Sequence, residues 1–524
     1  MTTLTPEQRA LGRNNANAAL GLSRRDFLIG AAAAGVGAGA TGAYYFKYKA
    51  IKDPVRAAII GTGNEGCQAM IHEHNRDYLN YIGYCDIRPS QQARAEREFL
   101  AHKQYTPDDV KKLKKYADAK EVFADPDVEV VVIALPLWLH APIAIDAMKA
   151  GKHVFCEKLM AHSVTECKEM CRVARQTNRL LAIGHQRHYS ALYDNANFLV
   201  QEGMLGEIRH IRALWHRNNA VPRIQKDKNG KLVYDSKTGE PVYQRDDKGN
   251  ILYFDSWKPD TPKDDMNVDF AKYGYKSLDE LIRWRLYNRT GAGLMAELGS
   301  HQLDACSIFL GKKHPFAVTG IGGTFFYQDG REVDDHVFVT FEFPGKAEKD
   351  HVVVTYSSIS TNRFENYGEE VMGSKGTMIV EGEADLMLYK EPDPNGKSTP
   401  SASTSITIEK QGGKPVIETS PSAAGPSVAA SLGGLATSTP SRGYREELEH
   451  FAYCVRHGDP SNYHEDAEHQ PRCRGEVALA DAVIALTSNL AMRQKRRIDF
   501  DPKWFDYTSD DVPEKSLGDL AKKA

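Results

Sequence analysis

The residues with the most specific chemistry form the hexapeptide Gly61-Thr62-Gly63-Asn64-Glu65-Gly66. It follows a short apolar strand over 55–60 and precedes an apolar-periodic helix. In that setting Gly61 makes the tight turn, Gly63 lets the backbone approach a pyrophosphate, and Gly66 allows close packing of helix on strand. The pyrophosphate then lies on the helix N-terminus, where free N–H groups and the helix dipole favour an anion. We therefore expect a dinucleotide-binding loop, which also includes Asn64 and Glu65.

The next apolar strand, over 81–85, ends at Asp86, at the distance from the glycines where a carboxylate meets the adenosine ribose hydroxyls. Asp86 favours NAD, because a 2′-phosphate would meet its negative charge. Arg88 favours NADP, since an arginine at this place can pair with its 2′-phosphate. We expect NAD as the cofactor and keep NADP as the alternative.

Further apolar strands alternate with helical patterns as far as residue 184. The strand over 128–135 is nearly continuous, as in a parallel strand buried on both faces. The remaining helices and strands of this unit are expected over 140–150, 152–156, 163–177 and 180–184. Five strands that alternate with helices predict an α/β fold with a Rossmann-type, doubly wound parallel sheet. Ligands bind at the carboxyl ends of such strands, where one cleft can collect Gly61, Asp86, Pro136, Lys158 and His185.

This unit resembles the Gfo/Idh/MocA oxidoreductase family, which includes glucose–fructose oxidoreductase and inositol dehydrogenase. The resemblance rests on Pro136, His140, the run Ala150-Gly151-Lys152-His153-Val154 and the pair Glu157-Lys158. In that family a proline usually follows the Glu-Lys pair, whereas this chain has Leu159. The resemblance implies that Lys158 lies beside the nicotinamide and the substrate hydroxyl. It also places Pro136, His140 and Glu157 among the cofactor-binding residues.

A second stretch, over 291–304, is similar to the family's glycine-rich helix with the pattern D-x-G-x-H. The similarity implies that His301 is the catalytic histidine, and Glu297 replaces the usual aspartate. Residues four apart face the same side of a helix, so the Glu297 carboxylate could orient the His301 imidazole or touch a sugar hydroxyl. A purely structural Glu–His pair is the other interpretation.

The resemblance implies an NAD(P)-dependent oxidoreductase that acts on a CH–OH group of a sugar or polyol by hydride transfer. The hydroxyl proton must leave as the hydride leaves, so a positioned base is needed. We assign His301 as the proton acceptor, because histidine titrates near neutrality, and Lys158 as the group that polarises the oxygen. The reverse assignment stays open. Further candidates for substrate contact are Arg187, Trp215 and Trp284.

Two alternatives to this dehydrogenase fit the same residues, as does a variant that couples the oxidation of one sugar to the reduction of another. Some relatives with this fold are exported NAD-dependent glycosidases, which oxidise a sugar transiently, eliminate the aglycone and reduce the product again. A tightly held cofactor that oxidises one sugar and reduces another would suit export equally well. A sugar-binding relative without catalysis is the second alternative, and the retained glycines, Lys158 and His301 weigh against it.

The N-terminal segment resembles a twin-arginine (Tat) export signal. Its motif, Ser23-Arg24-Arg25-Asp26-Phe27-Leu28, precedes an apolar stretch over 29–46 that is dominated by Ala and Gly. Such weak hydrophobicity suits a signal better than a stable membrane span. We expect residues 1–45 to be a signal or anchor read by the Tat export machinery. The protein would then be periplasmic, or anchored facing the periplasm, with a tightly bound cofactor loaded before export.

The rest of the chain predicts a second domain of α+β type. Apolar runs over 210–216, 317–327, 336–343, 351–358 and 377–381 suggest a mostly antiparallel open sheet. We expect the Rossmann domain over 52–190, the substrate and oligomerisation domain over 191–392 and 443–500, and a tail over 501–524. The open sheet face is the expected contact of a homo-oligomer. Three turn sequences predict a hairpin insertion over 217–280, and the low-complexity composition of 393–442 predicts an irregular loop.

The composition narrows the remaining classes of protein. The 524 residues include 67 Lys and Arg against 70 Asp and Glu, so the net charge of −3 argues against a nucleic-acid partner. A hydrophobic fraction of 41% excludes a dominantly disordered chain. The eight cysteines form no C-x-x-C pair, and we predict no metal site.

Overall fold

The computed structural model describes residues 4–20, 48–347, 349–391, 407–411, 414–418 and 442–517. Its first sheet has the strand order β3-β2-β1-β4-β5-β6, and all neighbouring pairs are parallel. The strands are β1 (Val55–Ile60), β2 (Leu79–Cys85), β3 (Lys114–Tyr116), β4 (Val130–Ile133), β5 (His153–Glu157) and β6 (Leu181–Gly184). This arrangement confirms the doubly wound parallel sheet. The sequence does not reveal the edge strand β3, because its three residues contain two lysines and no apolar run.

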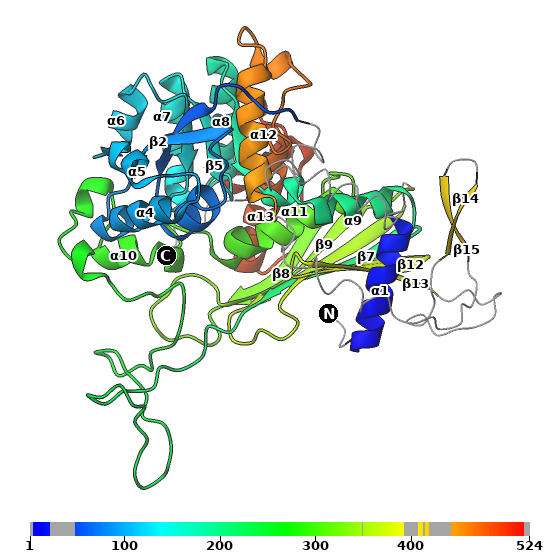
Figure 1. Ribbon diagram of the computed structural model, residues 1–524. Coiled ribbons are helices and arrows are strands. Elements are labelled where there is room, and N and C mark those ends of the chain that lie inside the picture. The colour runs from blue at the N-terminus through cyan, green and yellow to red at the C-terminus, as the bar shows by residue number, and fades with distance from the viewer. Residues whose placement is uncertain are drawn as a thin grey trace.

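The two faces of this sheet lie in two apolar clusters. Val131 and Ile133 of β4 belong to one cluster, while Val130 and Val132 belong to the other. All four side chains are buried, as expected for a parallel strand covered on both sides. The helical segments of the domain are η1 (Gly66–Ile71), α4 (Pro89–Ala101), α5 (Pro107–Lys112), α6 (Ala119–Ala124), η2 (Leu137–Leu139), α7 (His140–Lys149), α8 (Val164–Thr177) and η3 (Gln186–Tyr189). Figure 1 shows them around the sheet.

The second sheet has eight strands in the order β13-β12-β11-β7-β10-β9-β8-β16. They are β7 (Ile208–His216), β8 (Ala317–Gly323), β9 (His336–Pro344), β10 (His351–Ile359), β11 (Tyr367–Gly373), β12 (Gly376–Glu381), β13 (Asp385–Lys390) and β16 (Ile498–Asp499). Only the pair β10–β7 is parallel among these strands. The sheet is therefore mixed and mostly antiparallel, as predicted.

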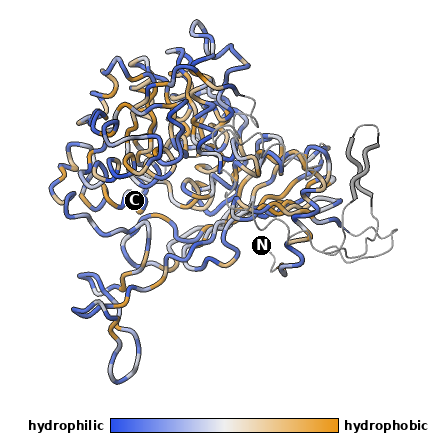
Figure 2. Tube along the Cα trace, viewed as in Figure 1, coloured by the Kyte–Doolittle hydropathy of each residue, from blue (hydrophilic) through white to orange (hydrophobic). Residues whose placement is uncertain are grey.

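Helices cover one face of this sheet. They are α9 (Ala191–Gln201), α11 (Ser300–Phe309) and α13 (Gly475–Gln494), and all three contact its strands. The opposite face carries exposed apolar side chains, including Ile321, Phe338 and Val353. Figure 2 shows the hydrophobic segments gathered along the strands of both sheets. The sheet thus has one packed and one open face.

The insertion after β7 forms an extended arm that projects from the body (Figure 1). Its three turn sequences form three turns, in which the carboxylates of Asp227, Asp235 and Asp246 accept backbone N–H groups two to four residues on. The chain then returns through two 3-10 turns, η4 (Lys263–Asp265) and η5 (Ala271–Tyr273), and the short helix α10 (Leu278–Ile282). Of these elements, η4 contacts α4 of the first domain.

The C-terminal helices return to different parts of the molecule. Leu448 and Phe451 of α12 (Tyr444–His457) belong to one apolar cluster of the parallel sheet. Helix α13 packs on α8, α11 and β8. By length and composition α13 could cross a membrane, but 67% of its apolar window is buried inside the protein, as in a core helix. The chain continues through η11 (Pro502–Phe505) to α14 (Pro513–Ser516).

The N-terminal helix α1 (Pro6–Ala19) packs on β13, the edge strand of the second sheet. It begins with a capping box formed by Thr5 and Gln8. Arg9 and Arg13 pair with Glu381 and Asp385. The twin-arginine motif that follows, together with most of the predicted loop over 393–442, lies outside the described residues. Within that loop, β14 (Thr407–Gln411) and β15 (Lys414–Glu418) form an antiparallel hairpin that the sequence does not predict.

Candidate active site

The glycine loop has the geometry that a dinucleotide needs. Gly61 has a φ of +93°, and a Cβ there would lie 2.3 Å from the Ala134 carbonyl oxygen. A Cβ on Gly66 would lie 2.1 Å from the Gly61 carbonyl oxygen. A Cβ on Gly63, in contrast, would meet no atom within 4 Å. The outer two glycines therefore serve the turn and the packing, while Gly63 faces open space on the side where a pyrophosphate is expected.

At the end of β2, backbone groups hold the Asp86 carboxylate. It accepts hydrogen bonds from the N–H groups of Thr62 at 2.8 Å and Arg88 at 2.9 Å. Burial raises the pKa of Asp86, and these hydrogen bonds oppose the shift. The Arg88 side chain turns elsewhere, because its Nε donates to Asp265 of η4 at 3.0 Å. Asp86 thus lies where a ribose hydroxyl is expected, while Arg88 already has a carboxylate partner.

Pro136 and His140 shape the turn after β4. Pro136 immediately precedes η2, and His140 begins α7. The two ring nitrogens of His140 lie 2.9 Å from the Leu135 carbonyl oxygen and 2.8 Å from that of Leu159. Burial lowers the pKa of His140. The ring therefore ties the end of β4 to the segment after Lys158, which is a positioning role.

Lys158 follows β5, and its Nζ donates to the main-chain oxygen of Glu297 at 2.7 Å. This bond joins the carboxyl edge of the parallel sheet to the second domain. The peptide bond between Lys158 and Leu159 is cis. The neighbouring Glu157 is buried, and burial raises its pKa to about 8, with a further contribution from the negative charge of Glu65. Glu157 is therefore largely protonated at neutral pH.

Glu297 lies on a turn of π-helix, η7 (Met295–Gly299), that runs directly into α11. Its carboxylate accepts a hydrogen bond from Arg285 Nε at 2.7 Å. Arg285, together with Lys158, holds the pKa of Glu297 below its usual value despite burial. The expected contact of this carboxylate with His301 is replaced by the ion pair with Arg285.

His301 is buried, and its Nδ1 has no hydrogen-bond partner among the described residues. Burial lowers the pKa of His301 well below its usual value, and the positive charges of Lys158 and Arg187 add to the shift. Its ring lies 5.4 Å from that of Trp215, which in turn stacks on Tyr367 at 4.5 Å. The imidazole is thus neutral and lies beside an aromatic surface, and its pKa is below the near-neutral value expected from the sequence.

The other two substrate candidates have partners within the protein. Arg187 is 2% exposed, and its guanidinium pairs with Glu369 at 2.7 Å and Glu383 at 3.1 Å. It also donates to the His301 carbonyl oxygen at 2.7 Å. Arg187 therefore supports the helix that bears His301. Trp284 is partly buried against the core and carries the Arg285 guanidinium 4.3 Å from its ring.

The sequence offered no signal for three residues of this region. Arg285 lies in a 3-10 turn, η6 (Trp284–Leu286), and Asp265 ends η4, and neither has a motif around it. Glu447 of α12 is buried, and both of its carboxylate oxygens are without partners among the described residues. Burial and the nearby Glu157 raise its pKa. The chain reaches this site from α12 after more than 280 residues, so spacing could not reveal it.

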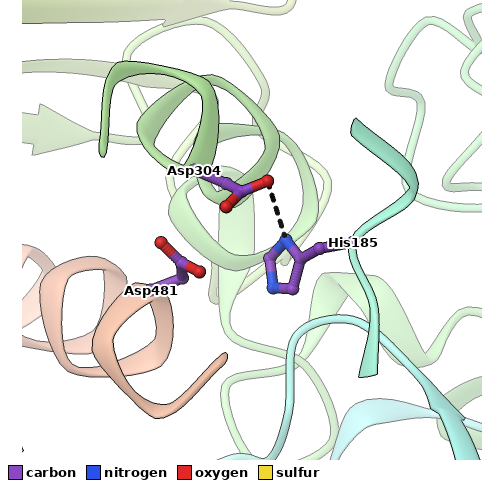
Figure 3. Close-up of side chains that lie close together, drawn as sticks. All are labelled: His185, Asp304 and Asp481. Carbon is purple, nitrogen blue, oxygen red and sulfur yellow. Dashed lines mark ion pairs between the residues drawn. The ribbon is translucent and has the colours of Figure 1, made fainter. Parts of the chain in front are cut away.

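A second polar cluster lies behind the site, where His185 after β6 meets Asp304 of α11 and Asp481 of α13 (Figure 3). Their ligand atoms lie within 4.8 Å of one another, and all three residues are buried. Lys312 Nζ lies 2.6 Å from Asp304 and 3.7 Å from Asp481. His188 Nε2 lies 2.9 Å from Asp304. The cluster thus has a lysine ammonium as its cation.

Comparisons with known proteins agree with this architecture. Residues 55–185 match the GFO/IDH/MocA family described as "Oxidoreductase family, NAD-binding Rossmann fold". Residues 266–379 match the "GFO/IDH/MocA C-terminal domain".

Among curated relatives, an uncharacterized oxidoreductase of Schizosaccharomyces pombe is 22% identical over 353 residues, or 66% of this chain and 77% of the relative. A glycosyl hydrolase family 109 protein of Shewanella pealeana is 28% identical over 167 residues, or 31% and 35%. An inositol 2-dehydrogenase of Salmonella typhimurium is 26% identical over 172 residues, or 33% and 48%. The latter two matches span less than half of the relative.

Among solved structures, an inositol dehydrogenase homologue from Azotobacter vinelandii, complexed with NADH and myo-inositol, has a TM-score of 0.55 at 15% identity, over 86% of this chain and 99% of that one. The aldose-aldose oxidoreductase from Caulobacter crescentus, complexed with glycerol, has a TM-score of 0.52 at 18% identity, over 86% and 100%. At such identities the likeness concerns the fold. The chain thus carries the NAD-binding Rossmann domain and the C-terminal domain of the Gfo/Idh/MocA oxidoreductase family.

Proposed function

We propose that the protein oxidises a CH–OH group of a sugar or polyol, with NAD as the hydride acceptor. The observation that carries the proposal is the hydrogen bond from Lys158 Nζ to the Glu297 main chain, one helical turn before His301. It brings an ammonium group and a neutral imidazole together at the strand ends that follow the glycine loop. Inositol and aldose enzymes among the relatives support a polyhydroxylated substrate.

In this proposal, His301 accepts the hydroxyl proton of the substrate. Its depressed pKa keeps the imidazole neutral before the reaction, which a proton acceptor requires. Lys158 donates a hydrogen bond to the substrate oxygen and stabilises the negative charge that develops there. The bound nicotinamide would accept the hydride that leaves the same carbon. Trp215, beside the imidazole, offers an apolar face for the sugar ring.

Kinetics of Lys158→Met and His301→Ala test these roles. We expect each change to lower kcat by about 10²-fold or more, as is typical for the loss of an acid–base group. We also expect His301→Ala to abolish the acidic limb of the pH–rate profile. Lys149→Met is the matched control, because Lys149 is exposed on α7. Full activity in both variants would refute the assignment.

Retention of the cofactor has a direct test. The purified protein is denatured, and any released nucleotide is identified by mass spectrometry. We expect NAD. Release of no nucleotide from natively purified protein would contradict tight binding.

A second candidate function is glycoside hydrolysis by transient oxidation. The observation that favours it is the local match to a glycosyl hydrolase family 109 protein. Nitrophenyl glycosides incubated with the protein, without added NAD, would then release nitrophenol with multiple turnovers. Oxidised sugar as the main product would contradict hydrolysis and support the dehydrogenase.

We further propose export by the twin-arginine route and self-association through the open sheet face. Replacement of Arg24 and Arg25 by lysine should leave the protein in the cytoplasmic fraction if the motif is read.

For self-association, Phe338 is 47% exposed in the middle of the open face, so a second copy of the chain would bury it. Phe338→Asp should reduce the mass measured by light scattering to that of one chain.

A further inference from the structure

Asp265 is a fully buried acid that reaches the cofactor domain from the projecting insertion. Its side chain has 0% exposure. The carboxylate accepts hydrogen bonds from Ser90 N–H at 2.9 Å, Ser90 Oγ at 2.6 Å and Arg88 Nε at 3.0 Å. All three donors belong to the N-cap and first turn of α4, just beyond Asp86. A residue of the second half of the chain thus contacts the residues that follow the expected ribose-binding carboxylate.

One part of this arrangement is structural. Helix α4 begins at Pro89, and its N-cap residue, Arg88, makes no side-chain cap bond. The Asp265 carboxylate takes over that role, because it accepts the free N–H of Ser90 in the first turn. A negative charge at a helix N-terminus is stabilising. This capping role explains the two hydrogen bonds from Ser90 to Asp265 but not the hydrogen bond from Arg88.

The bond to Arg88 affects the charge around the ribose. Arg88 lies between two carboxylates, since its backbone N–H donates to Asp86 and its Nε donates to Asp265. The three side chains carry a formal charge of −1. A 2′-phosphate would add about −1.5 to −2 and would compete with Asp265 for the same guanidinium.

We propose that Asp265 is a specificity-determining residue, which selects NAD over NADP by keeping Arg88 away from a 2′-phosphate. The inference rests on the proposed function only in requiring that the chain binds a nicotinamide dinucleotide. It implies that the preference for NAD over NADP depends on a segment outside the Rossmann domain. It also implies that Arg88 would bind the 2′-phosphate of NADP if Asp265 did not pair with it.

The test is nucleotide competition on the full chain. The protein is exchanged against an equimolar mixture of NAD⁺ and NADP⁺, freed of unbound nucleotide and denatured, and both nucleotides are quantified by mass spectrometry. Asp265→Asn preserves the shape and the helix cap, since asparagine is an equally good cap, but removes the charge. We expect the bound NADP:NAD ratio to rise about tenfold, which corresponds to one released charge–phosphate contact.

Two further variants isolate the cause. Asp264→Asn makes the same charge change at an exposed position of η4 and should leave the ratio within about twofold of wild type. Arg88→Met should change the ratio little in the wild-type background but remove the gain in the Asp265→Asn background. Arg88→Met alone remains informative even if Asp265→Asn does not fold, because a large fall in bound NADP would show that Arg88 already serves the phosphate.

The outcomes separate this inference from the proposed function. A wild type that binds NAD, with an unchanged ratio in Asp265→Asn, refutes the role of Asp265 and leaves the proposed function standing. An equal rise in Asp264→Asn also refutes it, because the effect would then be one of general charge. Binding of neither nucleotide by the wild type refutes the proposed function itself.

Discussion

Replacing Lys312 by methionine should destabilise the fold strongly, because its ammonium is the cation beside Asp304 and Asp481, two of the three side chains drawn in Figure 3. The ammonium lies 2.6 Å from Asp304, whose pKa it holds well below the usual range together with His188. Burial raises the pKa of Asp481 well above its usual value, and its carboxylate lies farther from the ammonium, at 3.7 Å. The substitution therefore acts mainly on the shorter ion pair, between Lys312 and Asp304.

Breaking a buried ion pair by removing one partner costs about 3–5 kcal/mol, but here only Asp304 is fully buried, since the Lys312 side chain is 30% exposed. Asp304 keeps its hydrogen bond from His188 at 2.9 Å, although burial lowers the pKa of His188. We expect a loss near the lower end, about 3 kcal/mol in the free energy of unfolding. Lys312 has a φ of 59°, and methionine, which is also unbranched, leaves that backbone cost unchanged.

The assay is guanidinium unfolding at about pH 7 and about pH 5. In the wild type, the depressed pKa of Asp304 stabilises the fold at neutral pH, and this contribution is lost as the pH falls through that pKa. In Lys312→Met the pKa of Asp304 rises, so the carboxyl can take up a proton, and the difference from wild type should shrink at pH 5. Lys313→Met, at an exposed position, is the control. A loss below about 1 kcal/mol, or an equal loss when a chelator is added to the wild type, would refute the reasoning.

Three further predictions concern the active site. Glu157→Gln should gain stability relative to wild type as the pH rises from about 4.5 to about 7, by at most about 3 kcal/mol. The reason is that the wild-type fold loses stability over that range, because the pKa of Glu157 is raised in the folded state. Parallel thermal melts of the two proteins across the range would contradict this prediction. Gly66→Ala should lower the melting temperature, because its Cβ would lie 2.1 Å from the Gly61 carbonyl oxygen. Gly63→Ala should melt as the wild type does but retain no nucleotide, because its Cβ meets no protein atom within 4 Å. Equal melting temperatures and equal nucleotide retention in the two variants would contradict these roles. Arg285→Met should raise the pKa of Glu297 and shift the pH–rate profile, and an unchanged profile would exclude a link between this pair and catalysis.

The parallel sheet and its glycine loop could be predicted because their signals are local. A strand, a tight turn and a helix N-terminus lie within 20 residues, and each glycine has a separate steric reason. Asp86 follows from the same spacing. The short edge strand β3 could not be predicted, because pairing with β2 rather than its own composition makes it a strand.

The site beyond the loop depended on contacts between distant segments. Arg187 follows a strand end, which suggests ligand contact, but Glu369 and Glu383 approach it from the far sheet and bury it. The Glu297–His301 spacing is correct for a helix face, yet the π-helical turn and Arg285 direct the carboxylate elsewhere. Tertiary packing determines the ion-pair partners of Arg187 and Glu297, and no sequence pattern near either residue predicts them.

Helix α1 adds an order of assembly to this fold. It precedes the other described elements in the chain, yet its docking surface on β12 and β13 lies some 372 residues later, as the Arg9–Glu381 and Arg13–Asp385 pairs show. The helix can dock only when the last long strand of the second sheet is in place. Its docking therefore requires that the β12–β13 edge of the second sheet has formed. Arg24 and Arg25 follow within a few residues, so an export signal at that position would be joined directly to a helix that docks on the second sheet.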